Sequence, residues 1–537
     1  MPASSASPAF QLPTDPVRLE FVKIRMSGTP WCLVATPDPE ETIAALATTA
    51  VPDAPDAPDV PPVSVAWSLA TGHRLLVGDK MPTALGSGEA TANKPSILLL
   101  AAAKLPQGSL LFFNVPSADF WRSDACVSAV VGLRSAFKAT SRCLVFVAQP
   151  GAGDKLPPQL EADVPILRVA LPSVEAMAKM VEDTVAGNPV AVADGDVTVA
   201  ARNLRGMTLF AAENAVARAC LFGKLDAASL ASVQRESVEA ATGGALQFER
   251  SRLTFDDVGG LTAFRDFAGR LFAGPEAPDL VVRVDEIDKV VGANATGTVA
   301  DNTGISQGLL RSLLTNIEDN GYLLGVLCGC AGSGKSLSTS ALGNSYNRTT
   351  LAVNFDRCKG SLVGQSEAAI QRVFDTIAAL GGRRVLMLAT ANRMDTLPPE
   401  LLSRAGGCGI WFFDAPSREQ RARIWDIQMR AHGLDPLQKR PDDAGMVGRD
   451  IRNACRMASM LGCSLVEAAP FTMKTGVVSL DLLVASRIEA ESRGYLDAEV
   501  AGPYRVRDVA MEEMVEAAGL RRKIVVIAGG GGKTGEA

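Results

Sequence analysis

Residues Gly329 to Ser336 read GCAGSGKS, a spacing typical of loops that hold the phosphates of a nucleotide. The apolar run at 323–329 predicts a buried strand before the loop, and the residues from Ser336 onward can begin a helix. Glycines let backbone amides surround phosphate oxygens at a helix N-terminus, where the helix dipole favours anions. The predicted phosphate-binding residues are Gly329, Cys330, Ala331, Gly332, Ser333, Gly334, Lys335, Ser336 and Leu337. Lys335 would hold the β and γ phosphates of ATP and Ser336 would be a Mg²⁺ ligand, the alternative being a glycine-rich turn with a solvated lysine.

A second string, VVRVDEID at 281–288, predicts a buried strand that ends in two carboxylates. In this interpretation Asp285 holds Mg²⁺, directly or through water, and Glu286 polarises the attacking water. The alternative is a pair of surface carboxylates, which the apolar residues before Asp285 disfavour.

The C-terminal tail contains a second GKT, at 532–534, but Ile527 stands where the pattern requires its first glycine. Because only three residues follow Thr534, no helix can form there to supply a dipole. We interpret this segment as a flexible tail.

Five further segments together resemble the AAA family of ring ATPases. They are FDDVGG at 255–260, GSLVGQSE at 360–367, VLMLATANR at 385–393, LPPELLSR at 397–404 and GRDIRNACRMA at 448–458. The resemblance covers roughly residues 252–470 and is closest to a group of plastid and cyanobacterial reading-frame ATPases. It implies an α/β P-loop module of five parallel strands, in an order resembling 5-1-4-3-2, followed by a helical lid.

The resemblance also implies roles for individual residues. Lys335, Glu286, Asn392 as sensor 1 and Arg404 as a finger acting on a neighbouring subunit would be catalytic. Asp257 and Gly259 would lie near adenine, and Arg449 matches the sensor-2 position. Arg404 and Arg449 have the alternative of being ordinary surface arginines.

The order of the segments departs from the family. Residues 280–322, which hold the acidic strand, a Gly/Asn-rich loop and a helical pattern, precede the phosphate loop instead of following the GSLVG segment. Because all five strands are parallel and both changed crossovers keep their direction, the same sheet can form. We therefore expect the Asp285 strand in the same sheet as the strand ending at Gly329, with the strand at 385–390 between them.

Two other departures concern activity. Only Arg404 is present where the family often has two arginines, since glycines occupy 406 and 407. Leu362 replaces the aromatic residue that precedes Val-Gly in members that thread polypeptide, and an aromatic would offer more area to bury. The sequence leaves threading open.

The N-terminal third alternates strand-like runs with helical or loop stretches, which predicts a parallel α/β sheet. It contains a Pro/Asp/Ala repeat at 51–63, interpreted as an exposed loop, and no phosphate loop. The resemblance implies a degenerate nucleotide-fold platform here, the alternative being an unrelated α/β substrate domain. The expected domains are an N-terminal tail (1–19), a degenerate RecA-like α/β domain (20–190), a helical linker (191–250), a large ATPase subdomain (251–415), a helical lid (416–500) and a C-terminal extension with the flexible tail (501–537).

Composition narrows the function classes. The chain has 537 residues, 47% of them hydrophobic, and its net charge of −6 gives no general nucleic-acid footprint. With two histidines and ten scattered cysteines a zinc site is not expected, and with no secretory or membrane segment we expect a cytoplasmic protein.

The sequence thus predicts a Mg²⁺-dependent, ATP-hydrolysing homo-oligomer, a hexameric ring that remodels or moves a macromolecular partner. A nucleotide-gated scaffold with little turnover is the alternative from a different class. A small-molecule kinase would leave Arg404, the sensor strand and the lid without a purpose. The sequence does not identify the partner.

Overall fold

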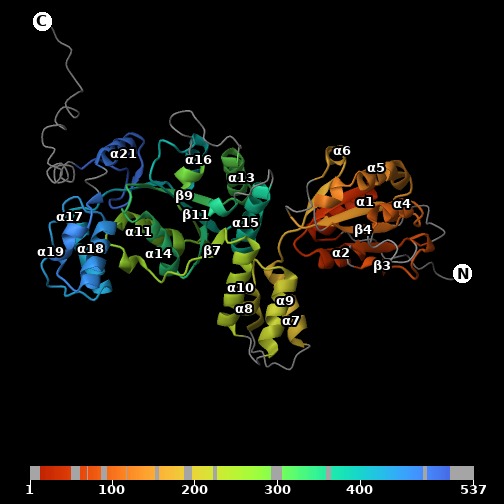
Figure 1. Ribbon diagram of the computed structural model, residues 1–537, viewed down its shortest axis with the longest axis horizontal. Helices are drawn as coiled ribbons and strands as arrows, with labels where there is room; N and C mark the ends of the chain where they lie inside the picture. Colours follow the sequence, from red (N-terminus) through yellow and green to blue (C-terminus); the bar gives the residue numbers. More distant parts are fainter. Residues whose placement is uncertain are drawn as a thin grey trace, which may run out of the picture. The chain divides into compact units, whose positions relative to one another are not determined.

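The computed structural model in Figure 1 describes most of the chain. The described residues are 13–49, 61–68, 71–85, 94–115, 118–150, 156–186, 196–221, 226–291, 305–358, 365–475 and 480–507. Residues 51–60 of the Pro/Asp/Ala repeat, the Gly/Asn-rich loop at 292–304, Leu362 and the tail from 508 lie outside them. The chain divides into two compact units, residues 1–237 with 361–379 and residues 238–360 with 380–537.

The first unit contains a six-stranded sheet in the order β3-β2-β4-β5-β1-β6. Its strands are β1 (Trp31–Ala35), β2 (Ser64–Ser68), β3 (Gly72–Val77), β4 (Leu110–Val115), β5 (Cys143–Ala148) and β6 (Ile166–Arg168). The strands other than β3 are parallel to one another, as the sequence predicts, whereas β3 pairs antiparallel with β2. The sheet is therefore mixed and not wholly parallel.

Helices cover both faces of this sheet because successive strand residues point to opposite sides. Leu33 packs in one hydrophobic cluster with residues of α4 and α5, while Val34 packs in the other with residues of α1 and α2. The helices of this layer are α1 (Pro16–Met26), α2 (Pro39–Ala47), α4 (Pro95–Ala102), α5 (Asp124–Ala139) and α6 (Pro158–Glu161). The first helix begins inside the segment expected to be a tail, because the Asp15 carboxylate caps it by accepting a hydrogen bond from Val17 N at 2.7 Å.

A group of helices follows the first sheet. Its members are α7 (Val174–Ala186), α8 (Asp196–Arg202), α9 (Leu209–Leu221) and α10 (Ala227–Ala241). A hydrophobic cluster that includes Val181, Leu204 and Val216 lies among them. The expected helical linker at 191–250 also contains a strand, β7 (Leu246–Phe248), so it is not wholly helical.

The second unit is built on a sheet in the order β13-β12-β9-β11-β8-β10-β7. The strands other than β7 are β8 (Leu280–Val284), β9 (Leu323–Gly329), β10 (Thr349–Val353), β11 (Val385–Ala391), β12 (Ile410–Phe413) and β13 (Leu496–Asp497). Five strands were expected and seven are found, because β13 extends the sheet beyond β12 and β7 pairs antiparallel with β10. The five central strands are parallel to one another.

The order of these strands shows where the rearranged segment, residues 280–322, lies in the sheet. The strand β11 pairs in parallel with β8 on one side and with β9 on the other. The expectation is therefore confirmed that Asp285 follows a strand of the same sheet as the strand ending at Gly329, with the 385–390 strand between them. In parallel strands the carboxyl ends meet at one edge, which brings residues 285, 330 and 392 to the same side of the sheet.

The second unit has two sets of helices: one set flanks the sheet, and the other follows β12 in the chain. The helices around the sheet are α11 (Thr262–Ala273), α12 (Ile287–Val291), α13 (Ile305–Asn320), α14 (Lys335–Ser345) and α16 (Pro399–Arg404). Most of α15 (Gln365–Gly381) belongs to residues 361–379, which are part of the first unit. Beyond β12 come α17 (Arg418–Ala431), α18 (Gly448–Leu461), α19 (Leu465–Ala468) and α21 (Leu480–Ser492). Figure 1 shows α17, α18 and α19 together in blue. Their buried residues, among them Trp425 and Ile451, form one hydrophobic cluster.

Two further features concern the whole described chain. Within the ranges given above, no helix combines the length and the apolar character needed to cross a membrane. The ten cysteines are free thiols, most of them buried.

Candidate functional site

The loop after β9 has a backbone that only glycine adopts easily. Gly329, Gly332 and Gly334 have φ angles of 138°, 86° and 102°, in the left-handed region. A methyl group on Gly329 would lie 2.1 Å from the carbonyl oxygen of Phe413, and one on Gly332 would lie 2.7 Å from Val447. The pattern of glycines in the sequence therefore corresponds to a local requirement for conformation and for space.

Lys335 begins α14 and is 6% exposed. Its ammonium group donates hydrogen bonds to the carbonyl oxygens of Gly329 and Cys330, both at 2.8 Å. Burial lowers the pKa of Lys335, since desolvation disfavours the charged form. The lysine is thus held inside the loop and is not the solvated side chain of the alternative interpretation.

A cavity of about 400 Å³ opens against this loop. Of the predicted residues, those that line it are Asp257, Gly259, Glu286, Ala331, Gly332, Ser333, Gly334, Lys335, Ser336, Leu337, Asn392 and Arg449. Lining residues that the sequence did not single out include Thr390, Asp414, Gln420, Ile424, Gln428 and Arg452. Gly329, Cys330, Asp285 and Arg404 do not line the cavity.

The two carboxylates after β8 are joined to the neighbouring strand β11 through Thr390. The backbone N–H of Glu286 donates to Thr390 Oγ1 at 3.0 Å, and the Thr390 hydroxyl donates to Asp285 Oδ1 at 3.3 Å. Glu286 itself has a φ of 52°, a conformation that is strained for a residue with a side chain. Its carboxylate accepts a hydrogen bond from Lys289 Nζ at 2.7 Å. These contacts fix the ends of β8 and β11 next to each other.

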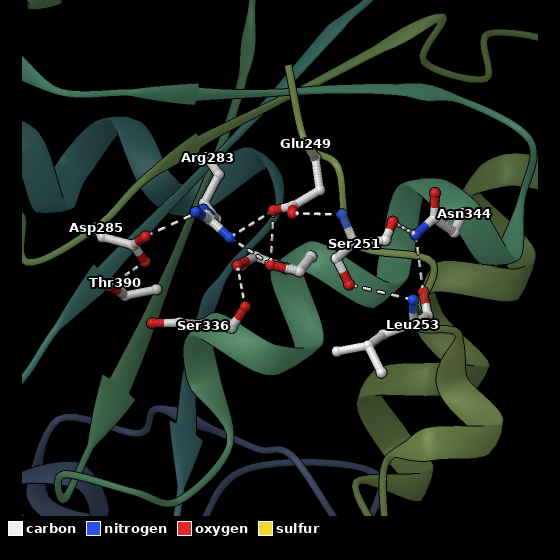
Figure 2. Close-up of polar contacts among 10 residues, drawn as sticks. Glu249, Ser251, Leu253, Arg283, Asp285, Ser336, Asn344 and Thr390 are labelled. Atoms are coloured by element: carbon white, nitrogen blue, oxygen red, sulfur yellow. Dashed lines mark hydrogen bonds and ion pairs between the residues drawn. The ribbon is translucent and has the colours of Figure 1, made fainter. Parts of the chain in front are cut away.

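Asp285 also forms an ion pair that the sequence analysis missed. Figure 2 shows Arg283 between Asp285 and Glu249. Arg283 Nε lies 3.0 Å from Asp285 Oδ2, and Arg283 Nη1 lies 2.7 Å from Glu249 Oε2. Since side chains two apart on a strand share a face, the signal was a charged residue inside an apolar strand, two positions before Asp285.

Glu249 is itself well bound, so the pair with Arg283 has a fixed partner. Its carboxylate accepts hydrogen bonds from Ser340 Oγ at 2.9 Å and from Ser251 N at 3.0 Å. Burial alone would raise the pKa of Glu249, but these hydrogen bonds and the charge of Arg283 lower it overall. Ser340 belongs to α14, so the network links the acidic strand to the helix of the phosphate loop.

The FDDVGG segment and residues of α17 and α18 form another side of the cavity. The carboxylate of Asp257 accepts a hydrogen bond from Thr254 N at 2.9 Å, so it caps a short helical turn while lining the cavity. A methyl group on Gly259 would lie 2.6 Å from Ile424 of α17, so this glycine permits close packing. Arg449, the second residue of α18, also lines this cavity.

The predicted sensor and finger residues lie in different places. Asn392 follows β11 directly and lines the cavity with Lys335 and Glu286. Arg404 ends α16, forms an ion pair with Glu318 of α13 and donates to Glu400 O at 2.9 Å. The structure therefore does not bring Arg404 to the cavity of its own chain.

A buried charge cluster lies just after β12, beside the cavity. The Asp414 carboxylate, which lines the cavity, accepts hydrogen bonds from Arg487 Nε and Tyr504 OH, both at 2.8 Å. Arg487 is 1% exposed, and burial together with the charge of Asp414 raises the pKa of Tyr504. Sequence reasoning had no signal for these contacts, because they join residues far apart in the chain.

The second unit is an α/β domain compatible with a P-loop module. No family model matches the chain. Curated relatives carry the name "Uncharacterized AAA domain-containing protein ycf46". The relative in Guillardia theta is 26% identical over 20% of this chain and 28% of its own length, and that in Pyropia yezoensis is 27% identical over 19% and 29%. The relative in Gracilaria tenuistipitata var. liui is 24% identical over 34% of this chain and 38% of its own length.

The chain therefore spans well under half the length of the curated relatives that it matches. Their printed names agree with the resemblance to AAA proteins inferred from the motifs, and that resemblance is confirmed.

Proposed function

We propose that this chain binds ATP with Mg²⁺ in the cavity beside Lys335, hydrolyses it, and works as a homo-oligomeric, hexameric ring that remodels or moves a macromolecular partner. The observation that carries the proposal is that residues from separate segments of the chain line one cavity. The left-handed glycine loop, the buried Lys335, and the Glu286 and Asn392 side chains all meet at one cavity. An accidental glycine-rich turn would not bring the carboxylate of a different strand to the same place.

The loop fits phosphate groups. Gly332 and Gly334 line the cavity without a side chain, so their backbone can approach a ligand closely, and the N-terminus of the eleven-residue α14 favours anions. Lys335 supplies a buried cation whose hydrogen bonds, among the described residues, go to backbone carbonyl oxygens. Phosphate oxygens would give that cation a charged partner.

The metal donors are oxygen atoms, which Mg²⁺ prefers. Ser336 lines the cavity, and Asp285 lies at the strand end beside Glu286. When bound there, Mg²⁺ would offset phosphate charge. The protein's own groups have separate tasks: Glu286 would orient and deprotonate the attacking water, Asn392 would hydrogen-bond near the terminal phosphate, and Arg449 would contact phosphate from the lid.

The first unit would be a platform in this proposal. The similarity to nucleotide-fold domains rests on its α/β sheet with helices on both faces, and no phosphate-loop pattern follows its strands. We propose the degenerate nucleotide-fold domain, the helical linker, the large ATPase subdomain and the lid at the boundaries given above, with the linker amended to end in β7.

One observation favours the alternative of a nucleotide-gated scaffold with little turnover. The carboxylate proposed to hold the metal is already paired with Arg283 at 3.0 Å. A weakly held metal would slow hydrolysis while allowing the nucleotide to stabilise an assembly.

The experiment compares the wild-type chain with Glu286→Gln, with Glu276→Gln as a matched control in the exposed loop before β8. We expect Glu286→Gln to bind ATP as the wild type does and to lose at least about 100-fold in turnover, because the carboxylate acts on water and not on the nucleotide. ATP binding is measured by calorimetry and turnover by phosphate release. Rapid turnover by Glu286→Gln would refute the catalytic assignment, and undetectable turnover by the wild-type ring would favour the scaffold.

A further inference from the structure

Asp285 faces two competing demands. As a proposed metal residue it must offer its carboxylate toward Ser336, yet its Oδ2 atom lies 3.0 Å from Arg283 Nε. The Arg283 side chain is 19% exposed and that of Asp285 is 36% exposed, so water screens this pair only in part. An arginine guanidinium stays charged at any working pH.

Arg283 has a second carboxylate partner, Glu249. The Glu249 Oε2 atom lies 2.7 Å from Arg283 Nη1, and the Glu249 carboxylate also accepts hydrogen bonds from Ser340 and Ser251. Two carboxylates thus share one cation, which leaves the trio with one net negative charge. Without Glu249, only Asp285 would balance the charge of Arg283, and the remaining pair would carry no net charge.

We propose that Arg283 is a positioning residue that acts through Asp285 to weaken the hold on Mg²⁺, and that Glu249 limits this effect. The inference rests on the proposed function, because it concerns the same metal position. Arg283 keeps the Asp285 carboxylate fixed while it lowers the negative charge that a divalent cation would meet. Consequently the metal binds mainly together with the phosphates of a nucleotide and only weakly to the protein alone.

The proposal predicts opposite effects from two substitutions in one network. Removing Glu249 leaves the full charge of Arg283 on Asp285, so the metal is held less strongly. Removing Arg283 frees Asp285, so the metal is held more strongly. A purely structural role for the network would make both variants worse in the same direction, since each leaves a partner unpaired.

The test measures equilibrium binding of a fluorescent, non-hydrolysable ATP analogue to the full chain, once with EDTA and once with Mg²⁺. The ratio of the two dissociation constants is the gain that the metal provides. We expect Glu249→Gln to lower this ratio by about three- to tenfold and Arg283→Met to raise it by a similar factor. Arg250→Met is the control, because it removes the same charge from an exposed arginine that pairs with Glu239, and it should leave the ratio unchanged.

If Arg283→Met fails to fold, the double variant Glu249→Gln/Arg283→Met replaces it and should give a higher ratio than Glu249→Gln alone. Ratios that move in the same direction in both variants, or that do not move, would overturn the inference while leaving the proposed function in place. If the wild-type chain binds the analogue in neither buffer, the proposed function is wrong and the inference falls with it.

Discussion

At the scale of single residues, the phosphate loop depends on glycines for two separable reasons. Gly329 has a positive φ and also lies against the backbone of Phe413, whereas Gly334 has a positive φ with its nearest neighbour 3.8 Å from a methyl group placed there. The first glycine answers both a conformational and a steric demand. The second answers only the conformational one.

We therefore predict unequal costs for the same substitution. Gly334→Ala should lower the free energy of unfolding by about 1–2 kcal/mol, the cost of a left-handed residue with a side chain. Gly329→Ala should cost more than about 3 kcal/mol, because the Phe413 carbonyl is backbone and cannot move aside. Urea denaturation of both variants measures this difference, and equal destabilisation would contradict the steric argument.

The sequence predicted some residues of the site and missed others for a physical reason. Lys335 and Glu286 belong to short motifs whose chemistry requires those residue types at that spacing. Arg283 received no role in the sequence analysis, although a partly buried cation inside an apolar strand needs a counter-charge. Its partner Glu249 lies after β7, and nothing local in the sequence pairs a carboxylate there with a strand more than thirty residues later.

At the scale of elements, the segment that contains β8, α12 and α13 comes before the loop at 329–336 in the chain. Its strand β8 nevertheless lies in the interior of the sheet. Parallel strands make this possible, because each helix returns the chain to the same edge before the next strand begins. Apolar runs predicted β8 and β9, and the resemblance to AAA proteins implied the strand at 385–390 and a total of five parallel strands. The edge strands β7 and β13 were missed, because two or three residues carry too little pattern to detect. The alternation of strands and helices along the chain predicted how the central strands are connected.

A rearranged chain tests this exchange of connections. Moving residues 280–322 to a position between Gly382 and Arg383, with short Gly/Ser joints, keeps every strand in its place in the sheet. We expect cooperative unfolding and ATP affinity within about tenfold of the natural order, because loop closure depends only weakly on length. Circular dichroism during urea unfolding and nucleotide titration provide the readouts. A soluble rearranged chain that lacks ATP binding would show that the natural order itself is needed.

At the scale of the whole molecule, the role proposed for Arg404 requires an assembly of several chains. In the single chain it is paired with Glu318 of α13 and does not line the cavity. An arginine that acts on a neighbour's γ-phosphate would leave this partner when a ring forms. Such a residue contributes on the order of 10³ to 10⁵ in rate in other phosphoryl-transfer enzymes.

We predict that Arg404→Ala keeps ATP binding by the isolated chain but loses at least about 100-fold in assembly-dependent turnover. Glu318→Gln, which removes only the partner within the chain, should retain turnover. Mixing Arg404→Ala with Lys335→Ala chains should restore part of the activity, because some interfaces then combine an intact loop with an intact finger. Mixed rings, verified by mass spectrometry, that show no rescue would contradict a role in trans.

The central claim is that the chain holds one nucleotide in the cavity beside Lys335. Calorimetric titration of ATP into the wild-type chain and into Lys335→Ala tests it most directly, with EDTA present so that hydrolysis does not interfere. We predict one ATP per wild-type chain, because the first unit has no phosphate-loop pattern, and a loss of affinity of at least about 30-fold in Lys335→Ala, which removes the buried cation. Two nucleotides per chain, or unchanged binding by Lys335→Ala, would contradict the account.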